Sequence, residues 1–168
     1  MKIKPEILLI KKQEHLYREI LVTGTDEVLI KYVTENIIEK FKHLNYFIDL
    51  SGKIDSGSSG DLFSDKKTLF VILEKQKKEF GDIVVGDDQA YIISSPNNVK
   101  INKIKARFTK TQNSLLVDCY PLDNIGKELV INHFLQSGEI KVSKEVYWYI
   151  LENFENRYVL LIKQLETL

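Results

Sequence analysis

The sequence predicts an α/β fold, in which helices flank a parallel sheet, followed by a small helical, lid-like domain. Up to residue 120, short apolar runs rich in β-branched and aromatic residues alternate with segments whose apolar residues recur at helical spacing. After Pro121 the strand patterns all but cease and helical patterns follow. Strands that alternate with helices are joined by right-handed crossovers and lie parallel in one sheet. We therefore assign an α/β domain to 1–120 and a three-helix domain to 121–168.

Five strands are expected in the first domain, over 20–23, 46–50, 68–73, 90–94 and 114–119. The third is apolar on both faces, as a central parallel strand should be. Thr25 is expected to cap a helix whose apolar positions continue to Phe41, and a basic helix is expected near 101–111. In the second domain, helical patterns run over 123–136, from a cap at Ser143 to Phe154, and from Val159 to Leu168.

Composition restricts the classes of function. The chain has 24 basic and 24 acidic residues, so no overall field attracts it to nucleic acid or membranes, and DNA binding would need a local patch. Cys119 is the only cysteine, which is typical of a reducing compartment, and its apolar neighbours predict a buried side chain. Neither a membrane-spanning apolar stretch nor a signal-peptide pattern is found, so we expect a cytoplasmic protein.

An apolar pair stands next to a flexible segment between the second and third strands. Residues 51–60 include three glycines and four serines, and Leu62 and Phe63 follow them among polar and charged residues. The pair either packs beneath the strand at 68–73 or forms an exposed tip that enters a partner's pocket. Burial of either side chain would contribute roughly 1.5–3 kcal/mol.

The run Asp61-Leu62-Phe63-Ser64-Asp65-Lys66-Lys67, followed by the apolar strand, resembles the clamp-binding tip of the delta subunit of the bacterial DNA polymerase III clamp loader. Three more segments are similar to that family in the same order: 21–30 to its first strand, glycine and helix, 136–143 to a turn in its second domain, and 161–166 to that domain's closing helix. The resemblance covers the family's first two domains, and the third, collar domain would be absent.

The resemblance implies an AAA+-like, P-loop NTPase-type fold that hydrolyses no nucleotide and needs no cofactor. It implies a non-catalytic subunit of a DNA polymerase III holoenzyme, which binds and opens the DNA sliding clamp during DNA replication. The clamp-binding residues would be Leu62 and Phe63. The partners would be the sliding clamp (beta), the other clamp-loader subunits and, within the assembly, DNA.

The residues themselves argue against a phosphate-binding loop at the strand–glycine–helix junction. The motif G-x-x-x-x-G-K-[ST] supplies glycines for backbone wrapping and a lysine for charge. Counted from Gly24, the second glycine, lysine and hydroxyl positions hold Leu29, Ile30 and Lys31. Asp26 and Glu27 add carboxylates that repel a polyphosphate. The alternative is an NTPase with an irregular phosphate loop.

Five cations without an acid lie between residues 100 and 110: Lys100, Lys103, Lys105, Arg107 and Lys110. They form either a solvated helix face or a strip that contacts DNA phosphates or a neighbouring subunit. A nucleic-acid-binding module that acts through this strip is the second alternative function. Tyr147, Trp148 and Tyr149 cannot all face inward, so part of this group is available to a neighbour. The three histidines, His15, His43 and His133, are too scattered for a metal site.

Overall fold

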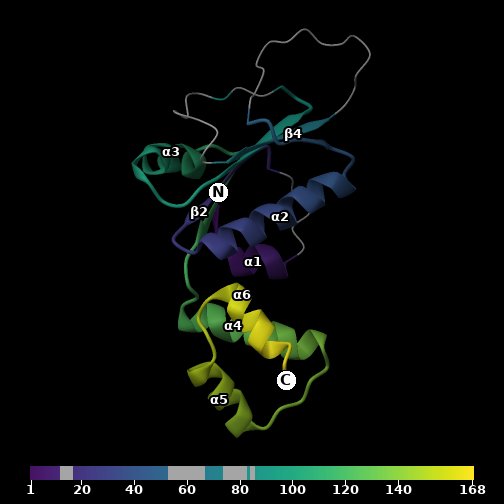
Figure 1. Cartoon of the computed structure of the whole chain (residues 1–168), viewed down its shortest axis with the longest axis vertical. Coiled ribbons are helices and arrows are strands. Elements are labelled where there is room, and N and C mark those ends of the chain that lie inside the picture. Colours follow the sequence, from purple (N-terminus) through teal and green to yellow (C-terminus); the bar gives the residue numbers. More distant parts are fainter. Residues whose placement is uncertain (12–16, 53–66, 74–82, 84–85) are drawn as a thin grey trace.

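A computed structural model describes residues 1–11, 17–52, 67–73, 83 and 86–168 (Figure 1). A sheet of six strands forms in the order β1-β6-β2-β5-β4-β3, and every neighbouring pair is parallel. The strands are β1 (Lys2–Ile3), β2 (Glu19–Gly24), β3 (Phe47–Asp49), β4 (Thr68–Leu73), β5 (Gln89–Ser94) and β6 (Ser114–Cys119). The predicted parallel α/β sheet is confirmed.

The five expected strands are all present, and β1 is an addition. It has two residues, which pair with Leu116 and Val117 of β6, so it is too short to show a periodic pattern in the sequence. The short helix α1 (Pro5–Ile10) follows it and was not expected either. Proline suits the first turn of a helix because its missing N–H has no partner to lose there.

Two longer helices belong to the sheet region. Helix α2 (Glu27–His43) is capped by Asp26, whose side chain accepts a hydrogen bond from the amide of Leu29 at 3.1 Å, so the expectation that Thr25 caps it was wrong. Thr25 lies one residue too early, and its own amide donates to the carbonyl of Cys119. Helix α3 (Val99–Lys110) is capped by Asn98 and matches the expected basic helix.

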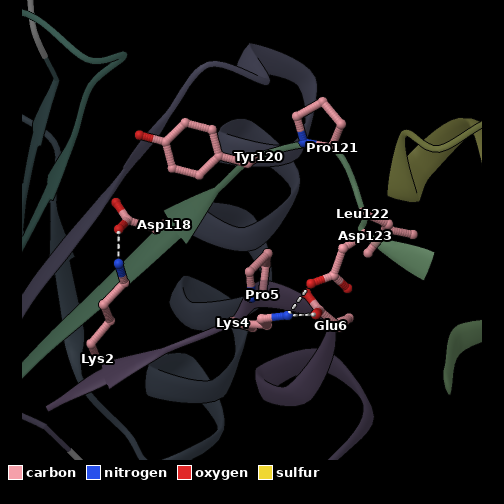
Figure 2. Close-up of a pocket in the computed structure, with 9 residues that line it drawn as sticks. All are labelled: Lys2, Lys4, Pro5, Glu6, Asp118, Tyr120, Pro121, Leu122 and Asp123. Carbon is pink, nitrogen blue, oxygen red and sulfur yellow. Dashed lines mark hydrogen bonds and ion pairs between the residues drawn. The ribbon is translucent and has the colours of Figure 1, made fainter. Parts of the chain in front are cut away.

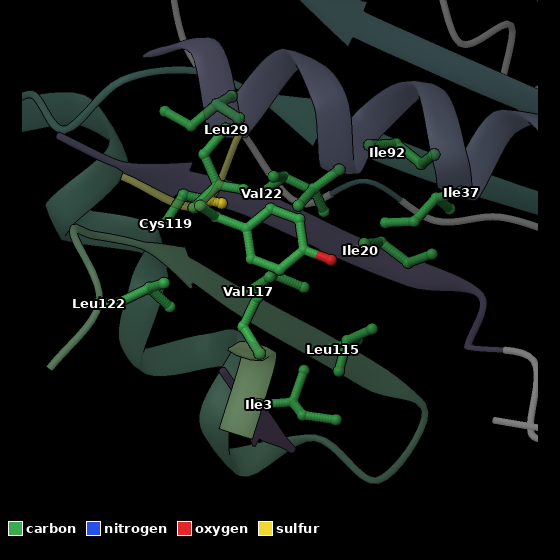
Figure 3. Packing of buried hydrophobic residues seen from close by; sticks show 14 of the residues in the cluster. Ile3, Ile20, Val22, Leu29, Ile37, Ile92, Leu115, Val117, Cys119 and Leu122 are labelled. Carbon is green, nitrogen blue, oxygen red and sulfur yellow. The ribbon is translucent and has the colours of Figure 1, made fainter. Parts of the chain in front are cut away.

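The sheet is covered on both faces. Side chains of β2 alternate between two hydrophobic clusters, with Ile20 and Val22 on one face and Leu21 on the other. The first face packs against α1 and α2, and Figure 3 shows Leu29 and Ile37 of α2 over it. The second face packs against α3 through its buried Ile101 and Phe108. Helix α2, which follows β2, and helix α3, which follows β5, therefore cover opposite faces of the sheet.

The chain after β6 is helical, as expected. Helices α4 (Asn124–Ser137), α5 (Lys144–Asn153) and α6 (Tyr158–Leu165) follow, and Asp123 and Ser143 cap the first two through their side chains. They lie together beyond one end of the sheet (Figure 1), where α4 packs against α1 and α6 packs against α2. In the part of the chain that the structure describes, no helix combines the length and apolar character needed to cross a membrane.

Candidate functional site

The arrangement of helices creates a switch point at the carboxyl edge of the sheet. Neighbouring strands β2 and β5 lead into α2 and α3, which cover opposite faces. In open parallel sheets, ligands usually bind just outside the carboxyl ends of two such strands. The loops there are 25–26, after β2, and 95–98, after β5, and the loop 120–123 after neighbouring β6 lies beside them.

Gly24 serves the contact between β2 and β6. Its φ is +149°, and a Cβ on it would lie 1.9 Å from the carbonyl oxygen of Cys119. That oxygen accepts hydrogen bonds from the amides of Thr25 and Asp26, at 3.0 and 3.1 Å. A phosphate loop uses such amides to hold an anion. Here the two amides are already bonded to a backbone carbonyl, and the carboxylate of buried Asp26 accepts the amide of Leu29 in the first turn of α2. This geometry weighs against phosphate binding at the junction.

Asn97 ties the other loops together. Its amide N–H donates to the carbonyl oxygen of Gly24 at 2.9 Å, and its Oδ1 accepts from the Thr23 hydroxyl at 3.2 Å. Its Nδ2 donates to the hydroxyl of Tyr120 at 2.7 Å. Asn97 therefore links the loop after β5 to the end of β2 and to the loop after β6, and the polar groups of the switch point are bonded to one another. The one signal of this arrangement in the sequence is that polar residues directly follow apolar strands.

A charged pocket of about 190 Å³ lies beside this edge, between β1, α1 and the β6–α4 connection (Figure 2). Lys2 binds Oδ2 of Asp118 at 2.7 Å, and Lys105 approaches Oδ1 at 3.1 Å as an ion pair without hydrogen-bond geometry. Lys4 binds Asp123 at 2.6 Å and lies 4.0 Å from Glu6. Each charged side chain lining this pocket has a partner of opposite charge, so the pocket offers no free charge to a ligand.

Glu6 is the one carboxylate here that is almost fully buried. Its burial raises the pKa of its side chain, and the nearby Lys4 ammonium only partly opposes that effect. Gly126 of α4 leaves room for it, because a Cβ there would lie 2.9 Å from Glu6 Oε1. Glu6 thus packs where α1 meets the start of α4.

The predicted basic strip divides into two sets. Lys105 is bound to Asp118, and its ammonium also lies 5.9 Å from the centre of the Tyr120 ring. Arg107 donates to the carbonyl of Ile83 at 3.1 Å and to the hydroxyl of Tyr91 at 3.3 Å, and it lies 3.6 Å from Glu19. Lys105 and Arg107 therefore link α3 to neighbouring parts of the fold. Lys100, Lys103 and Lys110 are exposed.

An apolar groove of about 550 Å³ runs between α2 and the carboxyl ends of β4 and β5. Its polar floor is the hydrogen-bonded pair Thr34 and Ser94, whose hydroxyl oxygens are 2.9 Å apart. Leu50 and Leu73 line it and are exposed. The predicted tip residues Leu62 and Phe63 lie outside the described residues, so their contacts stay a prediction.

The remaining candidates have structural surroundings. Cys119 is fully buried, as predicted, and burial raises the pKa of its thiol well above the usual range. His43 and His133 are exposed, and His15 lies outside the described residues. Among the residues that the structure describes, no group of three or more His, Cys, Asp or Glu side chains is arranged to hold a metal. Tyr147 is half-buried, whereas Trp148 and Tyr149 are exposed.

The carboxyl edge thus combines a closed switch point, a charged pocket with internal ion pairs and an apolar groove. This arrangement offers surfaces rather than an open, polar ligand site. Comparison with protein-family models finds none that matches the chain, and comparison with curated protein sequences finds no match.

Proposed function

We propose that this chain is a delta-type clamp-loader subunit, which binds the DNA sliding clamp and opens it during DNA replication without hydrolysing ATP. The proposal takes the sheet as an AAA+-like domain without a working phosphate loop and α4–α6 as a lid-like domain. It assigns the clamp-binding contact to Leu62 and Phe63. The other clamp-loader subunits would be its further partners.

The observation that carries the proposal is the position of this apolar pair in the chain. Leu62 and Phe63 follow a Gly/Ser-rich segment and precede β4 in the connection from β3. Strand β3 is the last strand at its edge of the described sheet. The connection therefore starts at the border of the sheet, where a partner has access, and not between two central strands.

The junction between β2 and α2 supports a subunit that does not hydrolyse nucleotide. The amides of Thr25 and Asp26 are bonded to Cys119, and Asp26 caps the helix itself. A triphosphate there would have to displace a backbone carbonyl and approach a carboxylate. The rival interpretation, an NTPase with an irregular phosphate loop, predicts measurable ATP affinity and is tested by titration with ATP.

The mechanism follows from binding thermodynamics. If the chain fits the opened clamp better than the closed ring, its binding shifts the clamp toward the open form by the difference between the two affinities and by no more. No bond is made or broken by this subunit. Hydrolysis elsewhere in the assembly would reset the cycle.

A calorimetric titration of the chain with a bacterial sliding clamp tests the proposal. Because each buried apolar side chain is worth roughly 1.5–3 kcal/mol, Leu62→Ala with Phe63→Ala should raise the Kd at least about 100-fold. The matched control replaces an exposed aromatic pair on α5, Trp148→Ala with Tyr149→Ala, and should leave the Kd within about threefold. An unchanged Kd in the first variant, or no binding by the natural chain, would contradict the proposal.

A further inference from the structure

Helix α3 is the only helix that the structure places against the second face of the described sheet, and its outer surface is cationic. Its buried side is formed by Ile101 and Phe108, with Ile104 partly buried beside them. No acidic residue occurs between 99 and 110. In a chain with no net charge, this surface is a local concentration of positive charge.

Three lysines supply the free charge on this surface. At about 100° per residue, Lys100, Lys103 and Lys110 fall within an arc of about 80° and span about 15 Å along the helix axis. Lys105 projects to a different side, where it binds Asp118. Arg107 shares the lysines' side of the helix, but its guanidinium is turned back to Ile83, Tyr91 and Glu19. Within the described part of the chain, the three lysines have no ion pair.

The chemistry of the surface favours nucleic acid over protein. Cores of protein–protein interfaces are depleted in lysine and depend on buried aromatic or apolar anchors. The large apolar residues of α3 are turned to the sheet, except for Val99 at the first helical position. Lysines that follow one line on a helix are instead suited to neutralise the phosphates of a DNA backbone, a contact that needs no apolar anchor.

We propose that α3 contacts the phosphate backbone of duplex DNA through Lys100, Lys103 and Lys110. Lys105 and Arg107, although they belong to the same run of sequence, keep the helix in place and do not contact DNA. The inference rests on the proposed function and names DNA as a second partner. DNA binding is measured without a clamp, so the DNA proposal and the clamp proposal can fail separately.

The test measures fluorescence anisotropy of a short labelled DNA duplex titrated with the full chain between 50 and 200 mM salt. Three neutralised phosphates predict a slope of log K against log salt of about −2.7, which is a loss of about 40-fold in affinity across this range. The variant with Lys100→Gln, Lys103→Gln and Lys110→Gln should lose most of this slope. Circular dichroism checks that the variant is folded.

The matched control removes three exposed lysines from the other end of the chain, with Lys141→Gln, Lys144→Gln and Lys163→Gln. It makes the same change in net charge, so it should keep the slope within about 0.5 of the natural value if the site is local. Equal losses in the two triple variants would show a net-charge effect and overturn the assignment. Absence of DNA binding at 50 mM salt, or polyglutamate binding as tightly as DNA, would also overturn it.

Discussion

Replacing Gly24 with alanine tests whether this glycine serves the contact between β2 and β6. The residue has a φ of +149°, which side-chain-bearing residues rarely adopt. An added Cβ would lie 1.9 Å from the oxygen and 2.5 Å from the carbon of the Cys119 carbonyl group. Both atoms belong to the backbone, so no side chain can rotate away to relieve the overlap, and the end of β2 must separate from β6.

The expected cost can be worked from the contacts that would be lost. The Cys119 oxygen accepts two backbone hydrogen bonds, from Thr25 and Asp26, and losing both costs about 1–3 kcal/mol in total. The backbone strain adds about 1–3 kcal/mol. The free energy of unfolding should therefore fall by about 2–6 kcal/mol, which is a large part of the 5–15 kcal/mol that is typical of a folded domain.

Urea unfolding followed by circular dichroism measures this free energy. Gly86→Ala is the matched control, because among the described residues a Cβ there would have only the Gln89 side chain within 4 Å, at 3.7 Å. That control should change stability by less than about 0.5 kcal/mol. A loss below about 1 kcal/mol for Gly24→Ala, or equal losses in the two variants, would refute the view that strand contact fixes this glycine.

Two further predictions concern buried ionisable groups. Burial raises the pKa of Glu6 above its value in the unfolded chain, so stability is lost as the pH rises from the unfolded to the folded pKa. Glu6→Gln should therefore raise the free energy of unfolding at pH 7, and urea titrations should show that this gain shrinks toward pH 4. A gain that stays constant with pH would exclude the buried carboxylate as its origin. Lys127 is buried, its ammonium donates to the carbonyl of Phe154 at the end of α5, and burial lowers its pKa. Lys127→Met keeps the aliphatic volume, so it should destabilise the chain by at least about 1 kcal/mol less than Lys127→Ala, and equal urea midpoints would contradict this account.

Much of the fold could be predicted because it is encoded locally. Every residue from 69 to 73 is apolar, so both faces of this strand are apolar. This pattern identifies a strand that is covered on both faces before its neighbours are known. Ser143 was assigned correctly as a cap because a hydroxyl directly before a helical pattern has few other roles. The error at Thr25 has the same local basis: Thr25 and Asp26 both carry side chains that can cap a helix, and the sequence pattern does not show that the first helical residue is Glu27, directly after Asp26.

The candidate site was less predictable because its contacts depend on strand order. Asn97 bonds to the end of β2 and to the loop after β6, and nothing in the sequence near Asn97 shows that β2 lies between β5 and β6. The basic strip shows the same limit. Lys105 and Lys103 look alike in the sequence, but Asp118 on β6 pairs with Lys105 and not with Lys103.

A closed carboxyl edge narrows the ways in which this chain can act. The donors and acceptors of Asn97, the amides after Gly24 and the charges around Asp118 are bonded within the protein, so a ligand at the switch point would have to break several of these bonds before making its own. Each broken bond that leaves a buried group unsatisfied costs about 1–3 kcal/mol. Contacts through the exposed lysines of α3 carry no such cost, because these side chains can meet a partner without rearrangement of the sheet. This difference is the physical reason for proposing functions that leave the switch point intact, and it predicts that the triple lysine variant of α3 leaves the unfolding free energy nearly unchanged while Gly24→Ala does not.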